Sequence, residues 1–216
     1  MKILGVIVDN KLTWEKHINK IKKQTHKTIA NLARTTHVLP LKSRKTLYDA
    51  LVTPHLNYCD IIWDGTSVTN AKALQKTGNF AAKALLGLKR KSSGTEALKK
   101  LNMVPLWLKR KIHMGVFVHK MMHSNGPKSI ADRYKDKIKR THSHHTRAAA
   151  RADMQITAHK TSRFKLSTQH RAVRCWNDIP IDLRAIPDTS VFKRRYQSLL
   201  VNNFKYDKGC LHSHCR

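Results

Sequence analysis

Two clusters of histidine and cysteine are the first residues in this sequence that could do chemistry. One contains His142, His144 and His145, and the C-terminal tail contains Cys210, His212, His214 and Cys215. A structural zinc site needs ligand pairs at set spacings, such as two cysteines two residues apart and a longer loop to the histidines. Neither cluster has that spacing. We therefore predict no metal site and no cofactor, with adventitious metal binding as the alternative for the tail.

Groups for acid–base or nucleophilic catalysis are also scarce. The chain has 216 residues but only 13 acids, and Glu96 is the only acid between Gly65 and Ala131. No Asp-Asp pair occurs, and neither a Gly-x-Ser-x-Gly turn nor a glycine-rich phosphate loop is present. We expect no catalytic residue in this chain and no small-molecule substrate.

Positive charge is the dominant feature of the composition. Lys and Arg number 43, for a net charge of +30, and the stretch from Lys72 to Arg140 has 18 of them against three acids. Such an excess favours a polyanionic partner over an isolated globule, although solvated helix faces are the simpler alternative. We predict sequence-tolerant binding of RNA or DNA through phosphate contacts from Lys22, Lys23, Lys76, Lys83, Lys89, Arg90, Lys91, Lys109, Arg110 and Lys111.

Tryptophans could add base stacking to these contacts. Trp107, beside Lys109 and Arg110, is the best candidate for a stacking platform, with core packing as the alternative. Core packing is favoured for Trp63 and Trp176, which have apolar neighbours.

The hydropathy of the sequence and the spacing of its cysteines indicate the cellular compartment in which the protein is expected. No apolar run approaches the ~18 residues of a membrane span, so we expect no membrane partner. Four irregularly spaced cysteines do not form a disulfide framework. These features predict a nuclear or cytoplasmic protein.

Helical periodicity accounts for most of the chain. Apolar stripes predict helices after Thr13, as N-cap, and over about 68–86, ending at Gly87; their members are Ile18, Ile21, Thr25, Ile29 and Leu32, and Leu74, Thr77, Ala81 and Leu85. The lysines between residues 16 and 27 are interpreted as spread over the remaining faces of the first helix. Further helices are expected over 105–122 and 191–200, whereas residues 3–8 form one strand without an evident partner.

Several short motifs, taken together, resemble one family. They are Lys2–Asp9 with Leu12–Trp14, Pro54–Tyr58 with Trp63, Leu74–Lys76 with Ala81, His142–Arg147, Trp176–Pro180 and Ser190–Lys193. In this order they resemble the region after the catalytic palm of non-LTR retrotransposon reverse transcriptases, most of all the jockey and CR1-like families. The resemblance covers nearly the whole chain.

This resemblance implies a primer-grip segment followed by a helical thumb that holds an RNA–DNA duplex. It also places the family's catalytic aspartates upstream of Met1, so we expect a non-catalytic piece of an RNA-directed DNA polymerase, from a truncated copy or a gene model built on one. Two alternatives stay open: a transposon-derived relic without a selected activity, and a domesticated protein-interaction module that uses the 105–122 helix.

The predicted fold is mainly α, with a division near residue 127. A palm-like strand or hairpin (1–14), orphaned from its sheet, precedes a helical thumb-like module (15–127). A basic, His-rich linker (128–160), a small and looser α-rich C-terminal module (161–204) and a tail (205–216) complete the chain.

Overall fold

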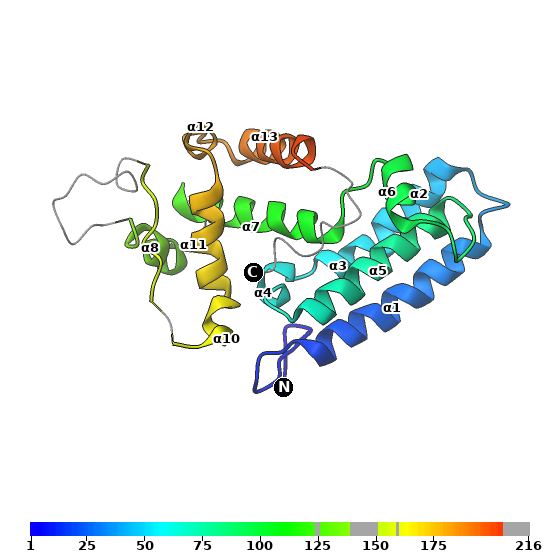
Figure 1. The fold of residues 1–216 in the computed structure, drawn as a ribbon, viewed down its shortest axis with the longest axis horizontal. Coiled ribbons are helices and arrows are strands. Elements are labelled where there is room, and N and C mark those ends of the chain that lie inside the picture. Colours follow the sequence, from blue (N-terminus) through cyan, green and yellow to red (C-terminus); the bar gives the residue numbers. More distant parts are fainter. Residues whose placement is uncertain (124–125, 139–150, 159, 205–216) are drawn as a thin grey trace. The chain divides into compact units, whose positions relative to one another are not determined.

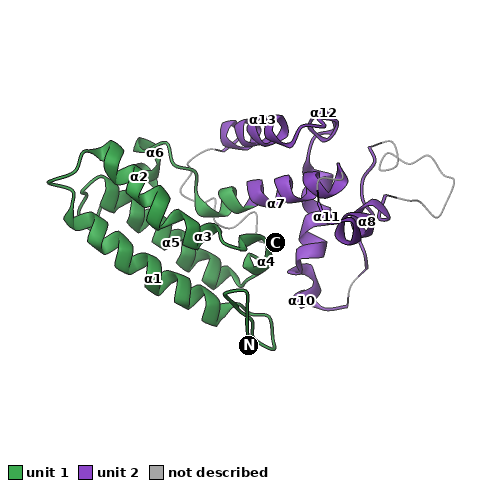
Figure 2. Ribbon diagram, turned by 180° about the vertical axis from the view of Figure 1, so that it is seen from behind, with its two compact units in different colours: residues 1–110, 205–216 green, residues 111–204 purple. Residues whose placement is uncertain are grey.

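The computed structural model describes residues 1–123, 126–138, 151–158 and 160–204. It confirms a mainly helical fold with one antiparallel hairpin at the N-terminus (Figure 1). Residues 1–110 form one compact unit, called unit 1, and residues 111–204 form unit 2 (Figure 2). The division falls within a helix and not near residue 127. Compactness does not show which segment folds on its own, so the predicted domain boundaries stay predictions.

Unit 1 contains the hairpin and the longer helices. Its elements are β1 (Lys2–Ile3), β2 (Val6–Ile7), α1 (Glu15–Arg34), α2 (Leu41–Leu51), α3 (Thr53–Asn57), α4 (Asp60–Trp63), α5 (Val68–Leu85), α6 (Gly94–Lys100) and the first turn of α7 (Leu106–Met122). Unit 2 contains the rest of α7 with α8 (Lys128–Lys135), α10 (Ser162–Lys165), α11 (Thr168–Asp178), α12 (Ile181–Arg184) and α13 (Thr189–Asn202).

The strand predicted over residues 3–8 is folded back on itself. Leu4 and Gly5 both have positive φ, 44° and 87°, and this tight turn pairs Ile3 with Val6. The Tyr58 hydroxyl donates a hydrogen bond of 2.6 Å to the Leu4 carbonyl oxygen. Turn chemistry at Leu4-Gly5 therefore makes a hairpin, which is tied to a later helical segment.

Asp9 holds the start of α1 in the role that the sequence assigned to Thr13. Its carboxylate accepts hydrogen bonds from the amides of Lys11, Thr13 and Trp14 at 2.8–3.0 Å, and from the Thr13 hydroxyl at 3.0 Å. The N-cap is Trp14, which has a left-handed φ of 63° and makes no side-chain cap bond. The amide bonds, chiefly that of Thr13, lower the pKa of Asp9 below its usual 3.8.

α1 and α5 contact each other, and both bury residues in the core of unit 1. All members of the two predicted apolar stripes are buried, which confirms the helical register of both segments. The two helices run parallel, with their starts close together and their ends close together. Just before the starts, the Thr66 hydroxyl donates a hydrogen bond of 3.0 Å to the Thr13 carbonyl oxygen. After the ends, Gly87 lies beside Thr36: a Cβ atom added to Gly87 would be 3.7 Å from the Cβ atom of Thr36. Gly87 ends α5 with a left-handed φ of 66°, as predicted.

Unit 2 is organised around the buried guanidinium of Arg184. It donates hydrogen bonds to the carbonyl oxygens of Ile179, Arg151 and Asn177 and to the carboxylate of Asp153, at 2.7–2.9 Å. The group also lies 5.3 Å from the centre of the Trp176 ring. One side chain thus links α12 to the end of α11 and to the 151–153 segment.

A second cluster joins α7 to α13 within unit 2. The ring of His119 stacks on Phe192 at 4.0 Å, and Phe192 stacks on Tyr196 at 5.3 Å. His119 is fully buried and its Nε2 lies 2.7 Å from the Ile186 carbonyl oxygen, while burial lowers its pKa. A neutral imidazole therefore serves here as a flat packing element.

Replacement of Asp9 tests the start of α1. We expect Asp9→Ala to lower the free energy of unfolding by about 1 kcal/mol, because three amides lose their acceptor. Asp9→Asn should keep much of that stability, since an amide oxygen also caps helices.

In acid, the pH dependence of the free energy of unfolding should differ between these two variants and the wild type. A lowered folded pKa means that the Asp9 contribution is full above pH 3.8 and is lost as the pH falls through the folded pKa. Urea unfolding between pH 6 and pH 2 should show this loss in the wild type and not in Asp9→Asn. Equal pH dependence in both proteins would contradict the assignment.

Candidate nucleic-acid interface

Five cations form a single stripe along α1. Lys16, Lys20, Lys23, Lys27 and Arg34 follow one another at steps of four, three, four and seven residues, so at 100° per residue they fall within a narrow arc. The arc is opposite the buried face of Ile18, Thr25 and Leu32 and their neighbours. The interpretation that these lysines are spread over all remaining faces is therefore wrong, except for Lys22, which lies to one side.

The stripe is available to a ligand. Lys16, Lys23, Lys27 and Arg34 are exposed and Lys20 is half-buried. Within the described ranges of the chain, none of the five forms an ion pair. No described carboxylate thus neutralises their charges.

Lysines also follow the outer side of α5. Lys76 and Lys83 lie seven residues apart on one face, away from the buried face that contains Leu74 and Leu85. Lys83 Nζ donates a hydrogen bond of 2.8 Å to the carbonyl oxygen of Arg90. This bond ties the basic loop after α5, with the exposed side chains of Lys89, Arg90 and Lys91, to the end of the helix.

The stripes of α1 and α5 belong to two helices of unit 1 that contact each other. The two helices are neighbours in both views and bury residues in one core (Figures 1 and 2). Each helix carries its cations on the side opposite its own buried residues. We call this surface the α1–α5 face: Lys16, Lys20, Lys23, Lys27 and Arg34 of α1, Lys76 and Lys83 of α5, and Lys89–Lys91 of the loop.

Two aromatic rings lie where α1 contacts α5, a line that we call the seam of the α1–α5 face. His26 of α1 has its ring centre 5.4 Å from that of Phe80 of α5, and its Nε2 lies 3.0 Å from the hydroxyl of Thr77. Partial burial, and next the charge of Lys22, lower the pKa of His26. The seam is therefore neutral at neutral pH, and the positive charge lies along its two borders.

Comparison with known proteins gives one significant likeness. The chain is 28% identical over 89 residues to a probable RNA-directed DNA polymerase from transposon X-element of Drosophila melanogaster. It is similar to part of a transposon polymerase. The matched segment is 40% of this chain and 10% of that protein. No protein-family model and no solved structure matches the chain.

This likeness supports an origin related to retrotransposon reverse transcriptases. It agrees with the family resemblance at that level, and it does not test the jockey or CR1-like affinity or the thumb-like role. The chain spans a small part of the relative, so the relative's activity does not transfer to this chain as a finding.

The remaining candidates from the sequence are placed differently. Trp107 and Lys109 are half-buried at the start of α7 and make contacts within the protein. Lys111 is half-buried and belongs to unit 2. Lys23, the α5 lysines and the 89–91 loop thus belong to the neighbouring helices α1 and α5 and the segment after α5, and the α7 group does not.

Arg110 departs most from the predicted role. Only 5% of its side chain is exposed, its Nε donates to the Asp64 carboxylate, and its guanidinium lies 5.8 Å from the centre of the buried Trp63 ring. A guanidinium engaged in this way is a core element of unit 1. We therefore correct the expectation that Arg110 contacts phosphate.

Lys16, Lys20, Lys27 and Arg34 were missed as binding candidates. Their signal was present in the sequence: the same 100° rotation that predicted the apolar stripe of α1 also aligns these cations. A total of charge along a stretch, such as that after Lys72, does not contain the phase of the charges around a helix.

The described residues hold no group of three or more potential metal ligands. Cys59 and Cys175 are free thiols, and burial raises the pKa of Cys175 to about 11. The 142–145 histidines and the 210–215 tail lie outside the described residues. No helix among the described segments is long and apolar enough to cross a membrane.

Substitution at Arg110 separates a core role from a phosphate contact. We expect Arg110→Gln to lower the free energy of unfolding by about 3 kcal/mol, at the low end for a buried pair because Asp64 is partly exposed. Asp64→Asn should act in the same direction, since it leaves the guanidinium without its charged partner. Urea unfolding measures both losses. An unchanged stability together with weaker nucleic-acid binding would restore Arg110 to the interface.

Proposed function

We propose that this chain is a nucleic-acid-binding segment of a retrotransposon RNA-directed DNA polymerase, and that the α1–α5 face holds an RNA–DNA duplex by its backbone phosphates. The observation that carries the proposal is the cationic stripe of α1. Five cations lie in one line, opposite the core and without an ion pair in the described part of the chain. A solvated helix face would not require the cations to be aligned.

The dimensions of α1 suit a duplex backbone. Lys16 and Arg34 are 18 residues apart, or about 27 Å at a rise of 1.5 Å per residue. A nucleic-acid strand presents one phosphate about every 3.4 Å along its axis, so several phosphates pass the stripe. Lysine ammonium groups meet these phosphates as point charges and read no bases, which gives sequence-tolerant binding.

The α5 lysines and the 89–91 loop extend the positive surface beside α1. If the α1–α5 face neutralises ~6–10 phosphates, affinity should fall by ~10³–10⁵ between 50 and 200 mM salt. This mode of binding positions a duplex and requires no catalytic group, cofactor or small-molecule substrate. The nucleus or the cytoplasm would supply the RNA and DNA.

The family resemblance favours a more specific form of the proposal. In that form unit 1 is thumb-like, follows a primer-grip hairpin and derives from a jockey or CR1-like element. The chain itself would be non-catalytic. A relic without a selected activity stays the alternative, and a cooperative unfolding transition of the isolated protein would argue against it. The protein-interaction module is less favoured, because Ile112, Val118 and Met121 of α7 are buried.

A triple substitution on α1 tests the proposal. We expect Lys16→Gln, Lys23→Gln and Lys27→Gln together to reduce the slope of log affinity against log salt by about 2–3, one phosphate contact being worth about 0.9. Fluorescence anisotropy with a 20-base-pair RNA–DNA hybrid, titrated from 50 to 200 mM KCl, gives the slope. The fold should persist, since these side chains are exposed and Gln is a comparable helix former.

The control removes the same charge elsewhere. Lys193→Gln, Arg194→Gln and Arg195→Gln together take three exposed cations from α13 of unit 2. This variant should keep a slope close to that of the wild type. Equal reductions in the two triple variants would show diffuse attraction to a basic protein and would overturn the α1–α5 face as the site.

A further inference from the structure

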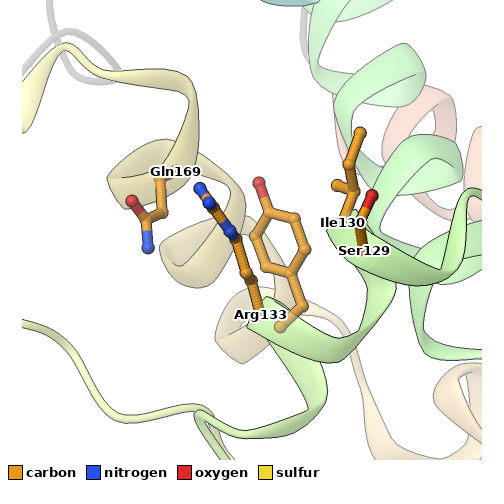
Figure 3. Close-up of a pocket in the computed structure, with 5 residues that line it drawn as sticks. Ser129, Ile130, Arg133 and Gln169 are labelled. Carbon is orange, nitrogen blue, oxygen red and sulfur yellow. The ribbon is translucent and has the colours of Figure 1, made fainter.

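A pocket in unit 2 is lined by residues of α8 and α11 (Figure 3). Its volume is about 330 Å³, and Ser129, Ile130, Arg133, Tyr134 and Gln169 line it. The four α8 residues share one face of that helix, and Gln169 is in the first turn of α11. Figure 3 shows Arg133 extending from α8 toward Gln169.

Tyr134 gives the pocket a hydroxyl group that forms no hydrogen bond with the described residues. Only 5% of the residue is exposed, and its ring packs edge-on against Phe117 of α7, with 6.1 Å between the ring centres. The hydroxyl is not among the fully buried unpaired atoms of the described residues, so it is accessible from the pocket. Burial raises the pKa of Tyr134, so the phenol keeps its proton and can donate at any physiological pH.

The lining selects the chemistry of the ligand. Ile130 and the tyrosine ring provide apolar surface, Tyr134 and Gln169 offer donors and an acceptor, and Arg133 adds a positive charge without an acid in the lining. A purely apolar ligand would leave these polar groups desolvated and unpaired. A small anion such as phosphate would leave the apolar wall unused.

One nucleotide combines the required features, with a flat base, a donor–acceptor edge and an adjacent anion. The volume is near the lower limit for ligand pockets, which suits one nucleotide and excludes a base-paired duplex. Proteins read single-stranded nucleic acid by taking unstacked bases into such sites. We propose that this pocket binds one unpaired nucleotide of a single-stranded RNA or DNA, with Tyr134 and Gln169 on the base edge and Arg133 on the flanking phosphate.

The proposal goes beyond duplex binding by unit 1 and does not depend on it. Its contacts to the base are uncharged hydrogen bonds, which salt screens little. Binding of a single strand should therefore retain a component at high salt that the α1–α5 face does not supply.

The test measures a fluorescein-labelled single-stranded octanucleotide on the full chain at 300 mM KCl. We expect Gln169→Ala and Tyr134→Phe each to weaken binding by about 3–10-fold, the effect of one lost hydrogen bond. Gln197→Ala, an exposed glutamine on α13, is the matched control and should bind as the wild type does. Tyr134→Phe keeps the buried ring, and equal thermal midpoints show that each variant is folded.

Three results would overturn the proposal. Wild-type affinity in both Gln169→Ala and Tyr134→Phe would show that neither side chain contacts the base. An equal loss in Gln197→Ala would show that the effect is not local. Competition by a free nucleoside monophosphate as strong as that of the strand would identify a free nucleotide as the occupant. Binding of a fully paired RNA–DNA hybrid should be the same in all three variants, which keeps this test separate from that of the α1–α5 face.

Discussion

The chain has 13 carboxylates against 43 lysines and arginines, and four of the described carboxylates hold parts of the fold together. Asp9 accepts the amides at the start of α1, and Asp188 caps α13 with a 2.6 Å bond from the Ser190 amide. Asp64 and Asp153 accept from two buried guanidinium groups. Carboxylates engaged in helix starts and buried pairs are not available to the surface lysines, which adds to the positive charge of an exterior that the net charge of +30 already favours.

In a chain with few carboxylates, arginine and lysine take different positions: some arginines are buried, and the lysines of α1 stay at the surface. A guanidinium can be buried when each N–H finds an acceptor, and Arg184 meets this condition with three carbonyl oxygens and one carboxylate. An ammonium on a flexible stem gains less from such a cage, and the α1 stripe contains four lysines and one arginine, all exposed or half-buried. Composition therefore overstates the number of cations that can meet a ligand, and it says nothing of which ones they are.

Local patterns in the sequence were sufficient for the helices and insufficient for the site. The stripes of α1 and α5 and the stop at Gly87 follow from a period of 3.6 and from the backbone freedom of glycine, both readable within one segment. The role of Arg110 depends on Asp64, 46 residues earlier, and no local rule predicts that pair. Asp9 was missed for a related reason, because its carboxylate reaches past the expected cap at Thr13 to the amide of Trp14. The alignment of the α1 cations, in contrast, follows from their spacing within one segment, because the helical period alone places them on one face.

The two proposed sites depend on different interactions: charge attraction to phosphates at one, and uncharged hydrogen bonds to a base at the other. Salt should therefore weaken the two modes of binding to different extents. Contacts from the α1–α5 face release counterions, so their contribution falls steeply as salt rises. The hydrogen bonds expected of Tyr134 and Gln169 are uncharged and lie at a partly enclosed surface, where screening by salt has little effect. At low salt any polyanion is attracted to unit 1, and discrimination is poor. As salt rises the uniform attraction weakens first, so preference for strands with an unpaired nucleotide should increase while total affinity falls.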